Sequence, residues 1–323
     1  MADDDQVKGN RRRAAFALVL AIVLAAGVIG ATKVIQDRAA RGPVLLPTVE
    51  MPDDDSAQCS HLMDALPDSI GRLMKADLMD PKPQGAAVYR DFTDDRITVR
   101  CGAPTPAQYT KLSRTFTEGG VEWLAVTDDT PELDLVTWFS VGASPVVAVT
   151  GSSDHKDSLA TIAEAMGDDF KPGPKRQPIP LMDIDAPQAD GVCDGLFAAM
   201  PDTLADRSRT KDEDMPDGVR LPDGAALWMD DAGDAITMRC GVQSPQSYAP
   251  GEQLTQVGEV VWFTEPTLSS GTTAAYFALG RQRLVAVHMP VGVASGVLPE
   301  ISAVIAANLD NTAPSELADG AGD

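Results

Sequence analysis

The sequence predicts an α+β protein in which an N-terminal transmembrane helix is followed by two tandem, homologous domains. Three observations lead to this prediction: a ten-residue stretch that occurs twice, an uncharged apolar run near the start, and strand-like segments between helix-like ones. The repeated stretch reads "RCGAPTPAQY" from Arg100 and "RCGVQSPQSY" from Arg239. Each domain is expected to contain a mainly antiparallel sheet of about five strands, flanking helices and one disulfide.

Length and charge narrow the functional classes. The chain has 323 residues, enough for about two ordinary domains, and 44% of them are hydrophobic, so a sizeable core can form. The chain has 26 basic and 48 acidic residues, which gives a net charge of −22. Because such a chain repels phosphate backbones, we expect no nucleic-acid partner.

The apolar run covers residues 14–32, contains no charge, and directly follows three arginines at 11–13. At about 1.5 Å per residue it nearly crosses a hydrocarbon core of about 30 Å. Signal peptides that are cleaved usually have shorter apolar stretches, of roughly 7–15 residues. We therefore expect an uncleaved signal anchor, with cleavage near Gly30 or Ala31 as the alternative. The arginine cluster predicts a single-pass protein of the cell membrane with its N-terminus inside and its bulk extracytoplasmic.

The repeat extends well beyond the "RCG" stretch. "CSHLMDALPDSI" from Cys59 matches "CDGLFAAMPDTL" from Cys193, and "ITVRCG" from Ile97 matches "ITMRCG" from Ile236. The two sets of matches follow each other in the same order in both halves of the chain. A repeat whose unit is this long indicates two tandem domains and not a solenoid.

Proline-rich and acidic stretches supply the boundaries between these units. The predicted organisation is a cytoplasmic N-terminus (1–13), a transmembrane signal anchor (14–32), a linker (33–58), a first α+β repeat (59–170), a Pro-rich linker (171–192), a second α+β repeat (193–311) and a disordered acidic tail (312–323).

The four cysteines form no CxxC pair, which argues against a zinc ribbon or a thioredoxin-type site. An even number beyond a membrane anchor indicates disulfides, but spacing alone allows three pairings. The duplication favours one disulfide within each unit, Cys59 with Cys101 and Cys193 with Cys240. Alternation along the strand also places Cys101 on the same inward face as Val99.

A family pattern emerges from these segments. Each unit starts with Cys…Leu…Pro-Asp, continues to "RCG", a Pro-x-x-Tyr turn and strands of the type V-x-W and V-x-V, and ends in a helix. The pattern resembles the actinobacterial domain-of-unknown-function family 3515, whose members are secreted or have one N-terminal membrane span. The second unit, with "GRQRLVAVHMPVG", follows it more closely than the first, which has "SVGASPVVAVTGS". The resemblance covers most of residues 59–310 and implies location and fold. It implies no catalytic residue, and two units depart from the usual single copy.

A search for chemistry finds no catalytic set. The three histidines, His61, His155 and His288, do not recur in the other unit, and we interpret them as incidental. "GSSDH" is a local run, whereas catalytic triads assemble across space, and no GxSxG, P-loop or GxGxxG motif is present. "DDAGD" from Asp230 lacks the terminal Glu of a calcium loop and is typical of a hairpin turn. We predict no catalytic residue, no metal ligand and no cofactor.

Arg100 and Arg239 are the weak candidates for binding. Both are predicted to face away from the core, where they could bind an anionic group of a partner or ligand. An internal salt bridge or a solvated sheet face is the alternative for each. For Trp123 and Trp262, core packing is favoured over lining a groove.

These observations favour a non-enzymatic interaction module or accessory subunit of a cell-envelope or membrane complex. Its expected partners are the lipid bilayer, through the N-terminal span, and a membrane or cell-envelope protein. The alternative is an extracytoplasmic small-molecule or polysaccharide-binding protein, or an enzyme, that uses a cleft between the repeats.

Overall fold

The structure is a computed structural model, and it describes residues 22–36, 38, 42–128, 130, 133–270 and 272–313. The predicted cytoplasmic N-terminus and the first part of the predicted span therefore lie outside the described residues. So does the acidic tail from residue 314 onward.

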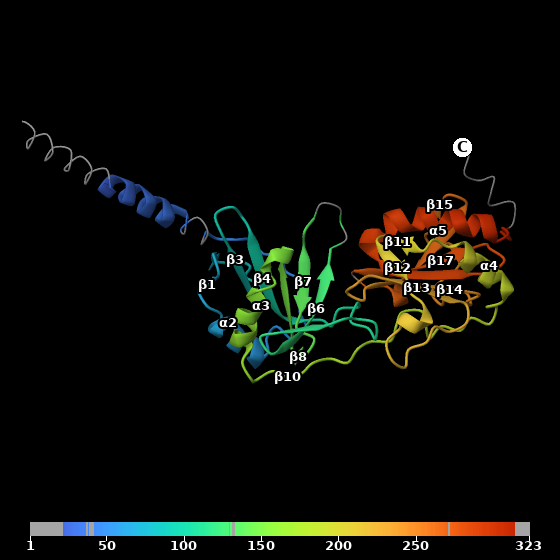
Figure 1. The fold of residues 1–323 in the computed structure, drawn as a ribbon, viewed down its shortest axis with the longest axis horizontal. Helices are drawn as coiled ribbons and strands as arrows, with labels where there is room; N and C mark the ends of the chain where they lie inside the picture. Colours follow the sequence, from blue (N-terminus) through green and yellow to red (C-terminus); the bar gives the residue numbers. More distant parts are fainter. Residues whose placement is uncertain are drawn as a thin grey trace, which may run out of the picture.

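Two units of the same construction follow one another along the chain (Figure 1). The first contains α2 (Ala57–Ala65), β1 (Ser69–Ile70), β2 (Leu73–Lys75), β3 (Ala86–Arg90), β4 (Arg96–Ala103), β5 (Phe116–Glu118), β6 (Val121–Thr127), β7 (Val136–Phe139), β8 (Ala143–Ser144), β9 (Val146–Gly151), α3 (Ser158–Met166) and β10 (Lys171–Pro172). The second contains α4 (Gly191–Ala199), β11 (Thr203–Leu204), β12 (Arg207–Arg209), β13 (Ala225–Met229), β14 (Ala235–Cys240), β15 (Thr255–Val257), β16 (Val260–Glu265), β17 (Thr273–Leu279), β18 (Val285–Pro290) and α5 (Ala294–Asn308).

The two main sheets have the same strand order. The first runs β1-β2-β3-β4-β9-β7-β6-β5 and the second β11-β12-β13-β14-β18-β17-β16-β15, so equivalent strands occupy equivalent places. Each sheet has eight strands, and the prediction of about five was wrong. The added strands, β1, β2 and β5 and their counterparts, have only two or three residues. A strand this short cannot show the alternation of apolar and polar residues by which strands are recognised in a sequence.

The helices of each unit pack on one face of its sheet. In the first unit Leu62 of α2 and Ile162 of α3 join Val99 of β4 in one core, and the second unit repeats this with Leu196 and Ile301. Alternation explains the inward face of β4, where Val99 is buried and its strand neighbours are half-buried.

Both disulfides form as predicted and no cysteine is free. Cys59 of α2 bonds to Cys101 of β4 with a Cα–Cα distance of 5.4 Å, and Cys193 of α4 bonds to Cys240 of β14 with 5.6 Å. Each therefore joins the first helix of a unit to the central strand of its sheet. Paired cysteines are typical of an oxidising, extracytoplasmic environment.

Two apolar helices lie among the described residues. The helix Ile22–Gln36 contains the described part of the predicted span, and its apolar side chains are exposed. By length and composition, the one helix in the described ranges that could cross a membrane is Val291–Asn308. This segment includes α5, whose Ile301 and Ile305 are fully buried against the second sheet.

Candidate functional site: two straps and a cleft between the units

A segment of irregular structure and turns ahead of each unit packs on the face of the sheet that carries no helices. We call residues 44–54 the first strap and residues 179–189 the second strap. Leu46 in the first and Leu181 in the second are buried, and Leu181 packs against Phe277 of β17. The first stretch falls in the predicted linker 33–58, and the second falls in the predicted Pro-rich linker 171–192. Proline suits such segments, because it packs without donating ladder hydrogen bonds.

The two candidate arginines hold these straps. Arg100 donates from Nη2 to the carbonyl of Pro47 at 2.7 Å. Arg239 donates from Nη1 to the carbonyls of Leu181 at 3.2 Å and Met182 at 2.8 Å. Arg239 is only 4% exposed, and burial lowers the pKa of its guanidinium. Both arginines face away from the helical core, as predicted, and each contacts the strap on that face. The strap buries Arg239, whereas Arg100 stays partly exposed beside its strap.

The glycine of each "RCG" allows the strap to pass close by. A Cβ on Gly102 would lie 2.3 Å from the amide nitrogen of Asp54, and one on Gly241 would lie 2.3 Å from the carbonyl carbon of Gln188. Both glycines have positive φ, +85° and +80°, a region that favours glycine. The amide of Gln188 also donates to the carbonyl of Gly241 at 3.1 Å. In the repeated triplet, the arginine and the glycine thus hold the strap and the cysteine holds the helix.

The three histidines lie on separate elements and form no site together. His61 is an exposed residue of α2, and His155 contacts Asp95 with an Nε2–Oδ1 distance of 2.8 Å. His288 is buried in β18, and burial lowers its pKa to about 4. Among the described residues no group of three His, Cys, Asp or Glu side chains could hold a metal ion.

His288 marks a difference between the units. Its register partner on β14 is Thr237, and neither His288 Nδ1 nor Thr237 Oγ1 has a hydrogen-bond partner in the described structure. In the first unit Thr150 occupies the equivalent position of β9, and its Oγ1 lies 2.9 Å from Oγ1 of Thr137. The second unit therefore contains buried polar atoms that its own side chains leave unsatisfied.

The "DDAGD" turn joins the two units. It connects β13 to β14, as predicted for a hairpin, and its tip contacts a loop of the first unit. The amide of Arg114 donates to the carbonyl of Ala232 at 2.9 Å. A Cβ on Gly233 would lie 2.3 Å from the carbonyl oxygen of Leu112, so only glycine allows this approach. Leu112 continues the contact by packing against Leu227 of β13.

A cleft of about 300 Å³ lies between the units beside this contact. Gln108 spans it, donating from Nε2 to Oγ1 of Thr272 at 3.0 Å. Asp128 and Thr137 line the first-unit side, and Asp234 lines the second-unit side. This cleft contains polar side chains from both repeats. The sequence suggests a cleft between the repeats only as an alternative, and its lining residues could not be named because they lie far apart along the chain.

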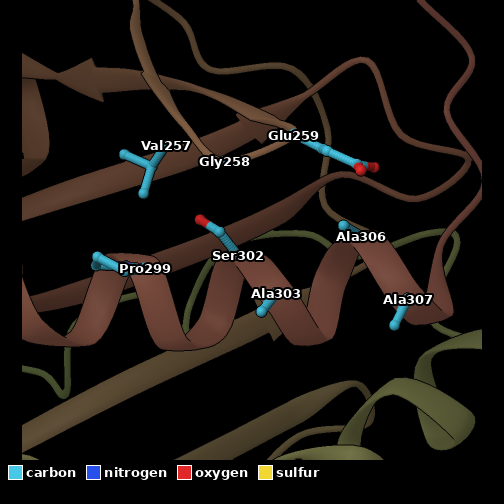
Figure 2. A pocket seen from close by; sticks show the side chains of 8 residues that line it. All are labelled: Val257, Gly258, Glu259, Pro299, Ser302, Ala303, Ala306 and Ala307. Carbon is cyan, nitrogen blue, oxygen red and sulfur yellow. The ribbon is translucent and has the colours of Figure 1, made fainter.

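A second hollow, of about 460 Å³, lies between α5 and the turn after β15. Figure 2 shows Ser302 and Ala306 of α5 on the side of the helix that faces the turn containing Gly258. Ala303 and Ala307 of the same helix also line the hollow. A Cβ on Gly258 would meet nothing within 4 Å, whereas one on Gly119, its counterpart in the first unit, would lie 2.6 Å from Cβ of Ala163. The hollow is thus open in the second unit and closed in the first. Trp262 lies beneath it, buried, and donates from Nε1 to Oγ of Ser302 at 2.9 Å.

Comparison with protein families shows to which family the chain belongs. The family described as "Protein of unknown function (DUF3515)" matches twice, at residues 18–175 and 159–314. The chain belongs to this family. No curated protein and no solved structure matches it.

Both family matches include a strap, and each starts further upstream, in the apolar run and in α3. Each match begins well before the first cysteine of its unit and includes the strap that precedes it. A DUF3515 unit in this chain is therefore a strap, a helix, an eight-stranded sheet and a closing helix.

Proposed function

We propose that this DUF3515 protein is a non-enzymatic interaction module of the cell envelope, held at the membrane by its N-terminal apolar helix. Its bulk is extracytoplasmic, and it acts as an accessory subunit of a membrane or cell-envelope complex. The two disulfides support the oxidising location.

The observation that carries the proposal is the docking of the first strap. Val44 pairs with Leu78, and its amide donates to the carbonyl of Asp77 at 2.8 Å. Val44 lies only six positions after Arg38, the last residue described as helical. Fully extended, six residues reach about 21 Å at most. A long flexible linker would let the first unit drift away from an anchored helix. The short stretch before the docked strap supports the proposal that the first unit stays close to the membrane.

Confinement of this kind favours a partner in the same membrane. A module that is held within a short reach of its partner binds at a high effective concentration, even when the contact itself is weak. An enzyme that acts on freely diffusing substrates would gain nothing from being held beside a membrane partner. The cleft between the units favours a second candidate function, the binding of a small ligand.

Proximity labelling in the native cells tests the proposal. The full chain, with a labelling enzyme at its C-terminus, is compared with a form that carries a flexible Gly/Ser insert after Gly42. An insert of about 20 residues adds roughly 25 Å of r.m.s. reach. The full chain should enrich a membrane or envelope protein, and the insertion should reduce that enrichment several-fold.

Two controls complete the experiment. The same insert placed between the C-terminus and the labelling enzyme should leave the enrichment unchanged, and the N-terminal helix fused to an unrelated domain sets the background. Equal enrichment by a secreted form of residues 42–323 would show that the anchor is dispensable. No enrichment above background would contradict the interaction role itself.

A further inference from the structure

The cleft between the units is a preformed cavity. On one side of it Gln108 bonds to Thr272, and Arg114 bonds to Ala232 close by. These contacts fix the two walls relative to each other before any ligand enters. Its volume of about 300 Å³ is that of a small-molecule site, and sites of this kind commonly lie where two domains meet.

The charge of the lining selects for cations. Asp128 and Asp234 line the cleft, and none of the lining residues that the structure describes is Lys, Arg or His. The hydroxyl and the amide of Thr130 hydrogen-bond to the Asp128 carboxylate and lower its pKa, so it is ionised at neutral pH. Asp234 is paired with Arg207 at 3.0 Å, which leaves Asp128 as the main charge offered to a ligand. An anion would meet this carboxylate and a net charge of −22.

Other parts of the lining are apolar and suit a short hydrocarbon chain. Val126 and Leu135 contribute from the first unit, and Pro290 and Val291 from the second. In the described part of the lining there is no aromatic side chain of the kind on which sugar or nucleobase rings stack.

A separate observation concerns the second-unit wall. Pro290 shares its face of β18 with His288, two residues earlier in the strand. His288 is 7% exposed and its Nδ1 has no partner in the described structure, nor does Oγ1 of Thr237 opposite it. Buried polar atoms are normally satisfied, by protein or by a bound molecule. His288 does not line the cleft itself, but Pro290, two residues further along the same face of β18, does. A ligand in the cleft therefore lies close enough in the strand to alter the surroundings of His288.

We propose that the cleft between the units binds a small organic cation, an aliphatic amine whose ammonium group pairs with Asp128 and whose carbon chain lies against Val126, Leu135 and Val291. This site is independent of the tethering role, because it needs neither the membrane helix nor a protein partner.

Binding of three matched probes to the full chain in detergent tests the site. Putrescine, butanediol and succinate share a four-carbon chain and differ in charge. Calorimetry should detect putrescine binding that weakens as salt is added, no binding of succinate, and butanediol binding at least tenfold weaker than that of putrescine. Putrescine should also shift the imidazole NMR signals of His288 and leave those of His61 unchanged.

Two variants locate the binding. Asp128→Asn should weaken putrescine binding about fivefold to tenfold, while Asp154→Asn, an exposed carboxylate in another loop, should leave it unchanged. Val291→Trp should fill the cleft and abolish binding with Asp128 intact. Failure of putrescine to bind at millimolar concentration would overturn the proposal. So would equal binding of putrescine and butanediol, or an equal response of the two Asp variants.

Discussion

At the scale of single residues, the repeated "RCG" triplet holds each unit together by three different kinds of contact. Arg239 satisfies two strap carbonyls, Cys240 forms a disulfide with α4, and Gly241 provides the space that the strap needs. A change at any of these positions would act on a contact with a segment far away in the chain. This structural role explains why the triplet recurs in both units.

His288 gives the second unit a pH dependence. Its neighbours in the sheet, Thr237 on β14 and Ala275 on β17, are neutral, and burial lowers its pKa from 6.5 to about 4. The unfolded chain takes up a proton near pH 6.5 while the folded chain does not. Neutral His288 therefore imposes no loss of folding free energy above pH 6.5. As the pH falls from 6.5 toward 4, the free energy of unfolding decreases by about 3 kcal/mol at most.

The variant His288→Thr, which places the first unit's residue here, tests this expectation. Urea unfolding between pH 7 and 4.5 should show a shallower loss of stability for the variant than for the parent chain. Carboxylates titrate alike in both proteins, so their contribution cancels in the comparison. Identical slopes would mean that His288 is accessible to protons in the folded state.

At the scale of elements, the straps complete the sheets. Each lies on the face opposite the helices, so the sheet is covered on both sides and its strands can be apolar on both. Thus β18 is buried along its whole length, from Val285 to Pro290. Without the second strap, Phe277 and Ala286 would be exposed to water.

Substitution of the motif glycine should dislodge the strap. Gly241→Ala adds a Cβ 2.3 Å from the carbonyl carbon of Gln188 as well as strain at positive φ. Gly71→Ala is the matched control, because Gly71 also has positive φ but has nothing within 4 Å of the added Cβ. We expect a loss of about 1 kcal/mol for the control and a further loss of about 1–3 kcal/mol for Gly241→Ala, measured by urea unfolding.

Limited proteolysis shows whether the loss of unfolding free energy in Gly241→Ala comes from displacement of the second strap. In the Gly241→Ala protein the second strap should become sensitive to cleavage near Leu181, while the first strap stays protected. Equal unfolding free energies for the two variants would show that the strap moves aside at no cost, contrary to its role as part of the unit.

At the scale of the whole molecule, two similar units meet through dissimilar surfaces. The hairpin tip of the second unit contacts the loop around Leu112 in the first, so the contact is head-to-tail and uses each unit differently. Because each unit uses a different surface in this contact, the two copies are under different structural constraints and can diverge in sequence. The cleft beside the contact and the open hollow over α5 both depend on features that the two units do not share.

Gly233 controls the contact between the units. Gly233→Ala adds a Cβ 2.3 Å from the carbonyl oxygen of Leu112, whereas Gly218→Ala adds one at a similar positive φ with nothing within 4 Å. The first variant should separate the units, giving two thermal transitions and a larger radius of gyration by X-ray scattering. The second should keep a single transition. Coincident transitions and unchanged scattering for both variants would show that the contact does not hold the units together.

The sequence by itself determined the duplication, the disulfide pairing and the inward face of the central strand. These follow from repeated letters and from alternation, both of which are local properties of a chain. Short strands such as β1 and β2 escaped prediction because two or three residues carry no periodic signal.

Only the tertiary structure decided what the arginines, the glycines and the proline-rich stretches do. Arg100 reaches Pro47 across 53 residues, and Gln108 reaches Thr272 across 164. Neither contact leaves a pattern in the sequence between its partners. A proline-containing segment has the same composition whether it lies free in water or packed on a sheet. The difference is made by the surface it meets, and that surface exists only once the sheet has formed.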